Sequence, residues 1–274
     1  MTDGTTRPAA PHPPDARREG VRRGSRFGLE GAAAVVGLVA LWALAALLAD
    51  TPRTLPGPWA VLAELGRLAG TGELWRDMGA TLARVLVSFL LALVAGTGAG
   101  VLMGRLGGAD RWLNPLLVIG LNMPALVVIV LCYIWIGLNE TAAIAAVALN
   151  KVPLVAVMIR DGTRALSPAL DEMASAFRMP AVDRWRHVIL PQLAPQLASA
   201  ARAGVSLIWK IVLVVEFLGR SNGVGFKLHM AFQLFNVTAV LAWALGFVAL
   251  MLAIDGLILR PWEARASRWR RDAA

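Results

Sequence analysis

The sequence predicts an all-α integral membrane protein with six transmembrane helices. Hydrophobic residues make up 57% of the 274 residues, charged residues only 16%, and the mean hydropathy is +0.62, far from the average of soluble proteins. Six apolar stretches, each about 18 to 27 residues long, are sufficient to cross a bilayer. The net charge of +9 comes mostly from arginines between these stretches, which is typical of membrane topology and not of nucleic-acid binding.

The apolar stretches divide the chain into one membrane domain, residues 31–262, between two basic tails. The expected spans are residues 32–49, 78–104, 113–138, 141–159, 196–218 and 237–259. The tail of residues 1–30 is rich in Arg, Pro and Gly, so we expect it to be disordered; residues 263–274 form the second tail. Residues 50–77 carry an amphipathic pattern after a rigid Pro-Gly-Pro sequence and are expected to form a short surface helix.

The distribution of positive charge predicts the orientation of the chain. If the N-terminal tail is cytoplasmic, the tail and the other cytoplasmic segments hold 18 of the 27 lysines and arginines. Those segments are residues 105–112, 160–195 and 260–274. Positively charged residues are enriched on the cytoplasmic side of membrane proteins, so both termini are expected to be cytoplasmic.

The sequence contains no recognisable catalytic or metal-binding pattern. Cys132 is the single cysteine, and His12, His187 and His229 lie in different segments without further metal ligands near them. No Walker sequence occurs, so ATP hydrolysis is not expected in this chain. The glycine-rich run from Gly96 to Gly104 lies in an apolar span and is expected to allow close helix packing. We therefore expect neither a cofactor nor enzymatic activity.

The cytoplasmic segment 160–195 predicts a helix-turn-helix. Ser167 can cap a first helix with Pro168 at its first position, and Pro180 stops that helix. Asp183 can cap a second helix, which is expected to end before Pro191. The two helices would present an apolar face to the groove of another protein, formed by Ala174, Phe177, Trp185 and Val188.

Several motifs together resemble one protein family. Glu172-Met173-Ala174 and Val188-Ile189-Leu190-Pro191 are similar in type and spacing to the cytoplasmic loop of permease subunits from bacterial binding-protein-dependent ABC importers. The chain has Arg178 where that loop has a glycine. Further motifs resemble the sulfonate, taurine and nitrate branch, and the similarity covers roughly residues 50–265: Leu55-Pro56-Gly57-Pro58, Trp209 to Glu216, and Gly223-Val224-Gly225.

The resemblance implies that the loop 160–195 is the coupling segment that inserts into an ABC ATPase subunit, which uses the ATP. It also implies an extracytoplasmic solute-binding protein, a second copy of the chain in a homodimer, and a place in the bacterial cytoplasmic membrane. A solvated basic connection is the simpler alternative for the loop. The expected coupling residues are Glu172, Ala174, Phe177, Arg178, Trp185, Leu190 and Pro191.

Polar residues inside the apolar spans indicate a candidate translocation path. Five residues of the fifth span, among them Trp209, lie within about 120° of one another on a helix, and Lys151 lies near the middle of the fourth span. Charges inside a bilayer are costly, so they usually face a bundle interior or a hydrated route. Pairing across helices or snorkelling to the interface is the alternative. The candidates are Lys151, Arg202, Ser206, Lys210 and Glu216.

These patterns predict the transmembrane subunit of an ATP-driven importer of a small organic solute, such as a sulfonate anion. An ion-coupled secondary carrier usually has internal repeats and buried acids, and a membrane-embedded enzyme or scaffold needs a catalytic constellation or a soluble domain. The sequence shows no internal repeat, few acids within the spans, and neither a catalytic constellation nor a sizeable soluble domain. The solute stays open among a sulfonate, taurine, nitrate and a thiamine precursor, and a paired permease stays open beside the homodimer.

Overall fold

The computed structural model describes residues 16–49 and 51–259, which are helical throughout apart from turns and contain no strand. Two compact units are present, residues 1–60 and 61–274. In the first unit, α1 (Ala16–Ala49) is followed by a turn, and the Nε1 of Trp42 in α1 donates a hydrogen bond to the Pro56 carbonyl at 3.1 Å.

The N-terminal tail differs from its predicted disorder, because α1 begins at Ala16. Alanine, arginine and glutamate have high helix propensity, so they continue the helix that the apolar stretch forms. Residues 1–15 and the C-terminal tail 263–274 lie outside the described residues.

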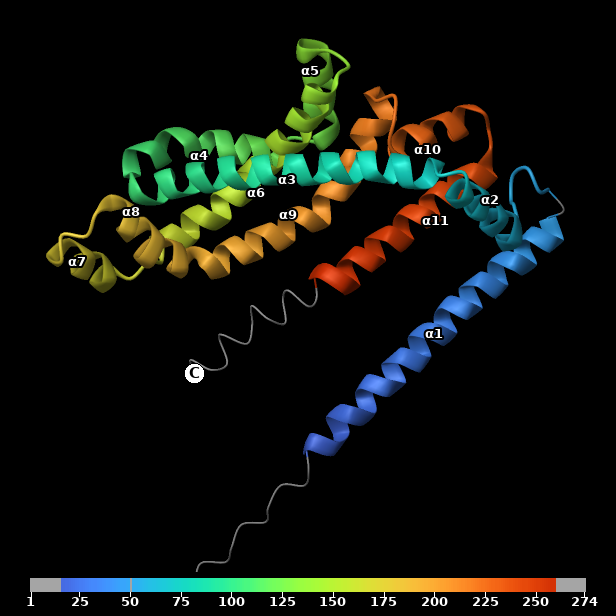
Figure 1. Cartoon of the computed structure of the whole chain (residues 1–274), viewed down its shortest axis with the longest axis horizontal. Helices are drawn as coiled ribbons and strands as arrows, with labels where there is room; N and C mark the ends of the chain where they lie inside the picture. Colours follow the sequence, from blue (N-terminus) through green and yellow to red (C-terminus); the bar gives the residue numbers. More distant parts are fainter. Residues whose placement is uncertain (1–15, 50, 260–274) are drawn as a thin grey trace, which may run out of the picture. The chain divides into compact units, whose positions relative to one another are not determined.

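Three long helices, α3 (Glu73–Arg105), α6 (Glu140–Arg164) and α9 (Leu190–Gly219), pack together at the centre of the second unit (Figure 1). The other helices of this unit are α2 (Pro58–Gly70, which begins at the end of the first unit), α4 (Gly107–Asn122), α5 (Ala125–Ile136), α7 (Pro168–Ala176), α8 (Ala181–Arg184), α10 (Val224–Gln233) and α11 (Val237–Ile254). The amphipathic surface helix expected within residues 50–77 is thus present as α2.

Glycines bring α3 and α6 close together. A Cβ atom built at Gly96, Gly100 or Gly104 would come within 2.5 to 2.6 Å of atoms of α6, closer than real Cβ contacts allow. The prediction that these glycines serve close helix packing is confirmed. Larger side chains at these three positions would separate the two helices.

Helix α9 runs antiparallel to α6. Near the loop 160–195, Gln196 of α9 lies so close to Gly162 of α6 that a Cβ on the glycine would be 2.5 Å from the glutamine Cγ. At the other end, Arg220 directly after α9 forms an ion pair of 2.8 Å with Glu140, the first residue of α6. These two contacts fix the register between the helices.

Three described helices are long and apolar enough to cross a membrane by length and composition: α3, α6 and residues 237–257. The pair α4 and α5 adds a fourth if it counts as one span. The apolar part of α1, Ala33–Ala49, is shorter. The chain is therefore a helical membrane protein, and the count of six spans stays a prediction.

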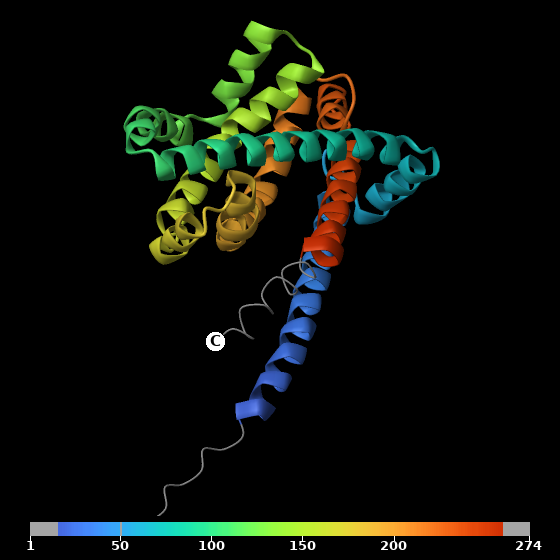
Figure 2. The same cartoon turned by 60° about the vertical axis from the view of Figure 1, so that its left-hand side comes forward.

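The third expected span is not one continuous helix. Helix α4 ends at Asn122 and α5 begins at Ala125, with a bend of 104° between them that Figures 1 and 2 both show. Pro124 explains the break, because proline pushes the preceding residue out of the helical region, and Met123 is extended at φ −73° and ψ 125°.

The second helix of the loop 160–195 also differs from its prediction. Helix α8 begins at Ala181 after Pro180, so Asp183 lies inside its first turn and does not cap it. The helix does not end before Pro191 but continues through a π turn, Trp185–Ile189, into α9. In that turn the Leu190 N–H bonds to the carbonyl five residues back, and the wider turn accommodates a proline ring next to it.

Candidate functional site

The first candidate site is the turn that ends α7. Helix α7 starts at Pro168 with Ser167 at the N-cap position, as predicted, although the Ser167 side chain makes no capping hydrogen bond. At the other end, Arg178 has φ +49°. The Arg178 N–H bonds to the Ser175 carbonyl and the Met179 N–H to the Ala174 carbonyl, each at 3.0 Å.

These two bonds form a Schellman motif, in which a left-handed residue, usually glycine, ends a helix. The chain therefore makes with Arg178 a tight turn that usually contains glycine. A side chain in the left-handed region costs about 1 kcal/mol. Pro180, which was expected to end the helix, follows after the turn is complete.

An ion pair ties the two halves of the loop together. The Arg184 guanidinium of α8 contacts Asp171 of α7, with Nη2 at 2.6 Å from Oδ2 and Nε at 3.2 Å from Oδ1. This hydrogen-bonded guanidinium lowers the pKa of the Asp171 carboxyl below its ordinary value. Arg105 at the end of α3 lies 3.7 Å from the same carboxylate, so the loop is also fixed to the helix core.

Only part of the predicted apolar face of the loop is exposed. Ala174 and Val188 are buried inside the loop, so the prediction that they are available to a partner is wrong. Phe177 is 78% exposed and Trp185 is 38% exposed. The remaining predicted coupling residues are exposed as well: Glu172, Arg178, Leu190 and Pro191.

The predicted polar stripe of α9 does not form one surface. Arg202 and Lys210 are exposed, whereas Trp209 and Glu216 are buried. The side chain of Ser206 lies outside what the structure describes. On α6, Lys151 is buried at 8% exposure.

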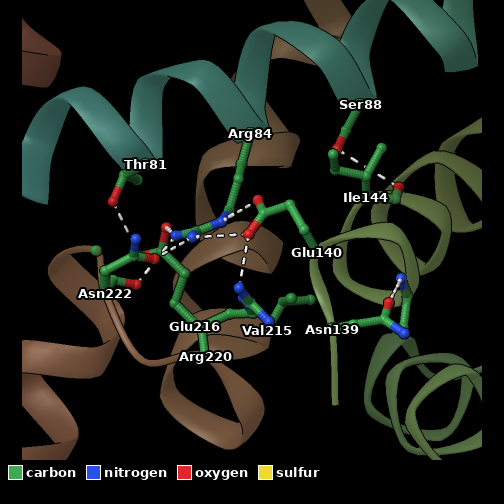
Figure 3. A network of polar contacts seen from close by, with 12 residues as sticks. Thr81, Arg84, Ser88, Asn139, Glu140, Ile144, Val215, Glu216, Arg220 and Asn222 are labelled. Atoms are coloured by element: carbon green, nitrogen blue, oxygen red, sulfur yellow. Dashed lines mark hydrogen bonds and ion pairs between the residues drawn. The ribbon is translucent and has the colours of Figure 1, made fainter. Parts of the chain in front are cut away.

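Glu216 belongs to a buried cluster at the end of the core opposite the loop (Figure 3). Its Oε1 accepts from Arg84 Nη1 at 2.6 Å, and its Oε2 accepts from the Thr81 hydroxyl and from the Gly225 N–H, each at 2.9 Å. Neither Glu216 nor Arg84 is more than 4% exposed.

Arg84 holds the other members of this cluster. Its Nε lies 2.6 Å from Glu140 Oε1, and its Nη2 donates to the Asn222 side-chain oxygen. One side chain thus ties α3 to α6, α9 and the turn before α10. Figure 3 shows these residues converging on the guanidinium.

Two glycines let the turn before α10 approach this cluster. Gly223 has φ +103°, and a Cβ there would lie 2.4 Å from the Glu216 carboxyl carbon. A Cβ on Gly225 would lie 2.2 Å from the Leu213 carbonyl oxygen. The Gly223-Val224-Gly225 motif is therefore required for backbone approach to a buried carboxylate.

Sequence reasoning identified Glu216 but missed its cation partner Arg84 and Glu140, the second carboxylate that Arg84 binds. A usable signal was present, because Arg84, Glu140 and Glu216 are charges of opposite sign at one end of three neighbouring apolar segments. Such charges commonly pair with one another inside membranes.

The fold and these sites define a helical membrane protein with several apolar helices. A structured loop lies at one end of its helix core, and a cluster of mutually paired charges lies at the other end. Residues 92–260 match the family described as binding-protein-dependent transport system inner membrane component. The chain belongs to this family. It is an ABC transporter permease, and ATP hydrolysis belongs to a separate subunit.

Two relatives come from Escherichia coli (strain K12). One, with the provisional name aliphatic sulfonates transport permease protein SsuC, is 30% identical over 235 residues, covering 85% of this chain and 89% of that protein. The taurine transport system permease protein TauC is 26% identical over 237 residues, covering 85% and 86%. The suspected resemblance to the sulfonate and taurine permeases is thus confirmed.

Solved structures support the fold. An amino acid ABC transporter solved with histidines matches with a TM-score of 0.59 and 20% identity, over 73% of this chain and 97% of that chain. The MetNI methionine ABC transporter in an inward-facing conformation matches with a TM-score of 0.57 and 21% identity, over 67% and 92%.

Proposed function

We propose that the chain forms, as a homodimer, the path through which an ATP-driven importer moves a small organic anion such as a sulfonate. It crosses the membrane six times with both termini in the cytoplasm. Residues 160–195 dock onto the ATPase subunit, and an extracytoplasmic binding protein delivers the solute. The relatives named for sulfonates and taurine support this choice of solute.

The observation that carries the proposal is the rigid loop formed by α7 and α8. It is fixed at its centre by Asp171 and Arg184, and it presents Glu172 and Phe177 outward. An exposed aromatic and an exposed carboxylate on a preformed loop fit docking to another protein. A merely solvated connection needs neither the ion pair nor the Schellman turn.

The test is uptake of labelled taurine and ethanesulfonate into vesicles that contain the permease, with and without ATPase subunit and binding protein. We expect uptake only with ATP and all components. Glu172→Arg should keep ATP hydrolysis but reduce uptake at least about tenfold, because a charge reversal at a contact costs more than 1.4 kcal/mol. Ala174 is unsuitable for this test because it is buried.

Arg53→Glu, an exposed charge reversal outside the loop, is the matched control and should transport normally. Normal uptake by Glu172→Arg and by Phe177→Asp together would contradict the docking role. Uptake driven by an ion gradient without the ATPase would contradict the whole proposal.

A further inference from the structure

Lys151 lies on the face of α6 that packs against α3 and α9. Val155 and Gly162 follow it at helical spacing: Val155 lies against Gly96 of α3 and shares a cluster with Ala200 of α9, and Gly162 lies against Gln196 of α9. This packing leaves Lys151 at 8% exposure.

The ammonium group of Lys151 has no partner within the part of the chain that the structure describes: it makes neither a hydrogen bond nor an ion pair there. A buried charge without a partner costs several kcal/mol. Lys227 is different, because its Nζ lies 3.6 Å from Glu73 and 3.8 Å from Asp77. The sequence has only these two lysines and Lys210.

The register between α6 and α9 places Lys151 and Lys210 at one level. Lys151 is midway between Glu140 and Gly162, which contact Arg220 and Gln196 of the antiparallel chain segment. The midpoint of that segment is residue 208. Lys210 is therefore within about one turn of the level of Lys151.

Lys210 also lies at the edge of the same α6–α9 contact. It follows Gln196, which touches α6, by two heptads, so the two side chains share one face of α9. Lys210 is exposed and, among the described residues, its ammonium likewise has no hydrogen-bond or ion-pair partner. Two positive charges without partners among the described residues thus lie at one level of two neighbouring apolar helices.

We propose that Lys151 and Lys210 bind the anionic group of the solute at this level of the α6–α9 contact, so that the permease itself selects for negative charge. The inference rests on the proposed function, which supplies the anion. A sulfonate offers three oxygen acceptors to ammonium donors and compensates charge that the protein leaves open. The exposed Lys210 makes the first contact, and the buried Lys151 excludes neutral solutes.

The test uses the assembled permease–ATPase complex in nanodiscs made only of phosphatidylcholine, so that no anionic lipid is present. The thermal midpoint of unfolding is measured against increasing ethanesulfonate and against ethyl methyl sulfone, a neutral molecule of similar size. We expect ethanesulfonate to raise the midpoint and the sulfone to have no effect. Uptake of labelled ethanesulfonate into vesicles is measured in parallel.

Lys151→Met and Lys210→Met should each require at least about tenfold more ethanesulfonate for the same shift, the loss expected for one charge-assisted hydrogen bond. Lys151→Arg should retain the response. Lys227→Met, which removes a paired lysine, is the matched control and should respond as the wild type. Lys151→Met should fold, because methionine has a similar length and removes an uncompensated charge.

The outcomes separate the site from the transport function. If ATP-driven uptake occurs but Lys151→Met and Lys210→Met show the same thermal shift with ethanesulfonate as the wild type, the anion site is contradicted and the proposed function is not. The anion site is also contradicted if uptake occurs but ethanesulfonate does not raise the thermal midpoint of the wild type. The same holds if the midpoint rises only when the nanodiscs are made with anionic lipid in place of phosphatidylcholine alone. A lysine-dependent shift without ATP-driven uptake supports the anion site and contradicts the proposed function.

Discussion

The two groups of charges inside the apolar helices differ in how they are compensated. At one end of the core, Arg84, Glu140 and Glu216 satisfy one another with contacts of 2.6 Å, and a backbone N–H and a threonine hydroxyl complete the set. In the middle of the helices, Lys151 and Lys210 have no such partners among the described residues. Charge alone therefore does not identify a transport site in a membrane protein, whereas the absence of a partner does point to one.

Removal of Arg84 should change the unfolding free energy more than any other substitution considered, and it tests most directly whether paired and unpaired charges differ. Arg84→Met leaves the buried Glu216 carboxylate without its cation, so we expect a loss of about 3 to 5 kcal/mol in unfolding free energy. Lys151→Met should cause no loss. Chemical denaturation of the purified protein in detergent measures both variants. An equal loss in the two variants would remove the distinction between compensated and uncompensated charges.

The glycine turn offers a second way to disturb the compensated cluster without touching its charges. Gly223→Ala places a Cβ against the Glu216 carboxyl group at a positive φ, so we expect a destabilisation of about 2 to 4 kcal/mol. Gly98→Ala is the matched control, because no heavy atom lies within 4 Å of its Cβ position. That variant should gain up to about 1 kcal/mol from helix propensity. Equal stability of the two variants would contradict the close approach at Gly223.

A smaller effect is expected at the loop 160–195, where Arg178 has a left-handed backbone conformation. This case sharpens the comparison because it tests backbone strain and not the pairing of charges. Arg178→Gly relieves the left-handed conformation and should stabilise the loop by about 1 kcal/mol. Slower amide hydrogen exchange across α7 would report this change. Arg186→Gly, at an exposed position in the π turn, should instead speed exchange. Faster exchange in Arg178→Gly would contradict the strained turn.

The smallest effect concerns the exposed ion pair of the loop. Arg184 lowers the pKa of Asp171, so the ionised carboxylate stabilises the folded loop above the ordinary aspartate pKa, and this stabilisation is lost as the pH falls through the lowered value. Solvent screening limits the effect to about 0.2 to 1 kcal/mol. Asp171→Asn should flatten the dependence of loop stability on pH below about 4. An unchanged pH profile in that variant would assign the dependence to another group.

Much of the architecture follows from local pattern. Hydrophobic stretches located the long helices, Ser167 and Pro168 located the start of α7, and Gly96 to Gly104 predicted a close helix contact, because each of these signals acts within one or two turns. Pro124 is also a local signal for the bend, but the continuous apolar stretch 113–138 predicted one helix across it. The continuation of α8 past Pro191 depended on a π turn, which sequence periodicity does not reveal.

The candidate sites were less predictable because they depend on contacts between distant segments. Glu216 and Arg202 share one face of a helix by angle, yet one is enclosed by Arg84 and Thr81 while the other stays exposed. Ala174 and Phe177 are both apolar loop residues, but only the smaller one fits into the interior. Such differences depend on neighbouring helices, whose positions the sequence pattern does not state.

Helix α8, the π turn and α9 form one continuous helical segment, so a tilt of this segment moves residues by an amount that grows with their distance from the fixed point. Glu216 is held in place by its ion pair with Arg84, and Leu190 at the start of α9 lies about 39 Å from it at 1.5 Å per residue. A tilt of about 5° would then move Leu190 by about 3.4 Å but Lys210 by only about 0.8 Å. A large movement at the loop end of α9 would thus reach Lys210 as a small adjustment that leaves the packing of the surrounding helices intact.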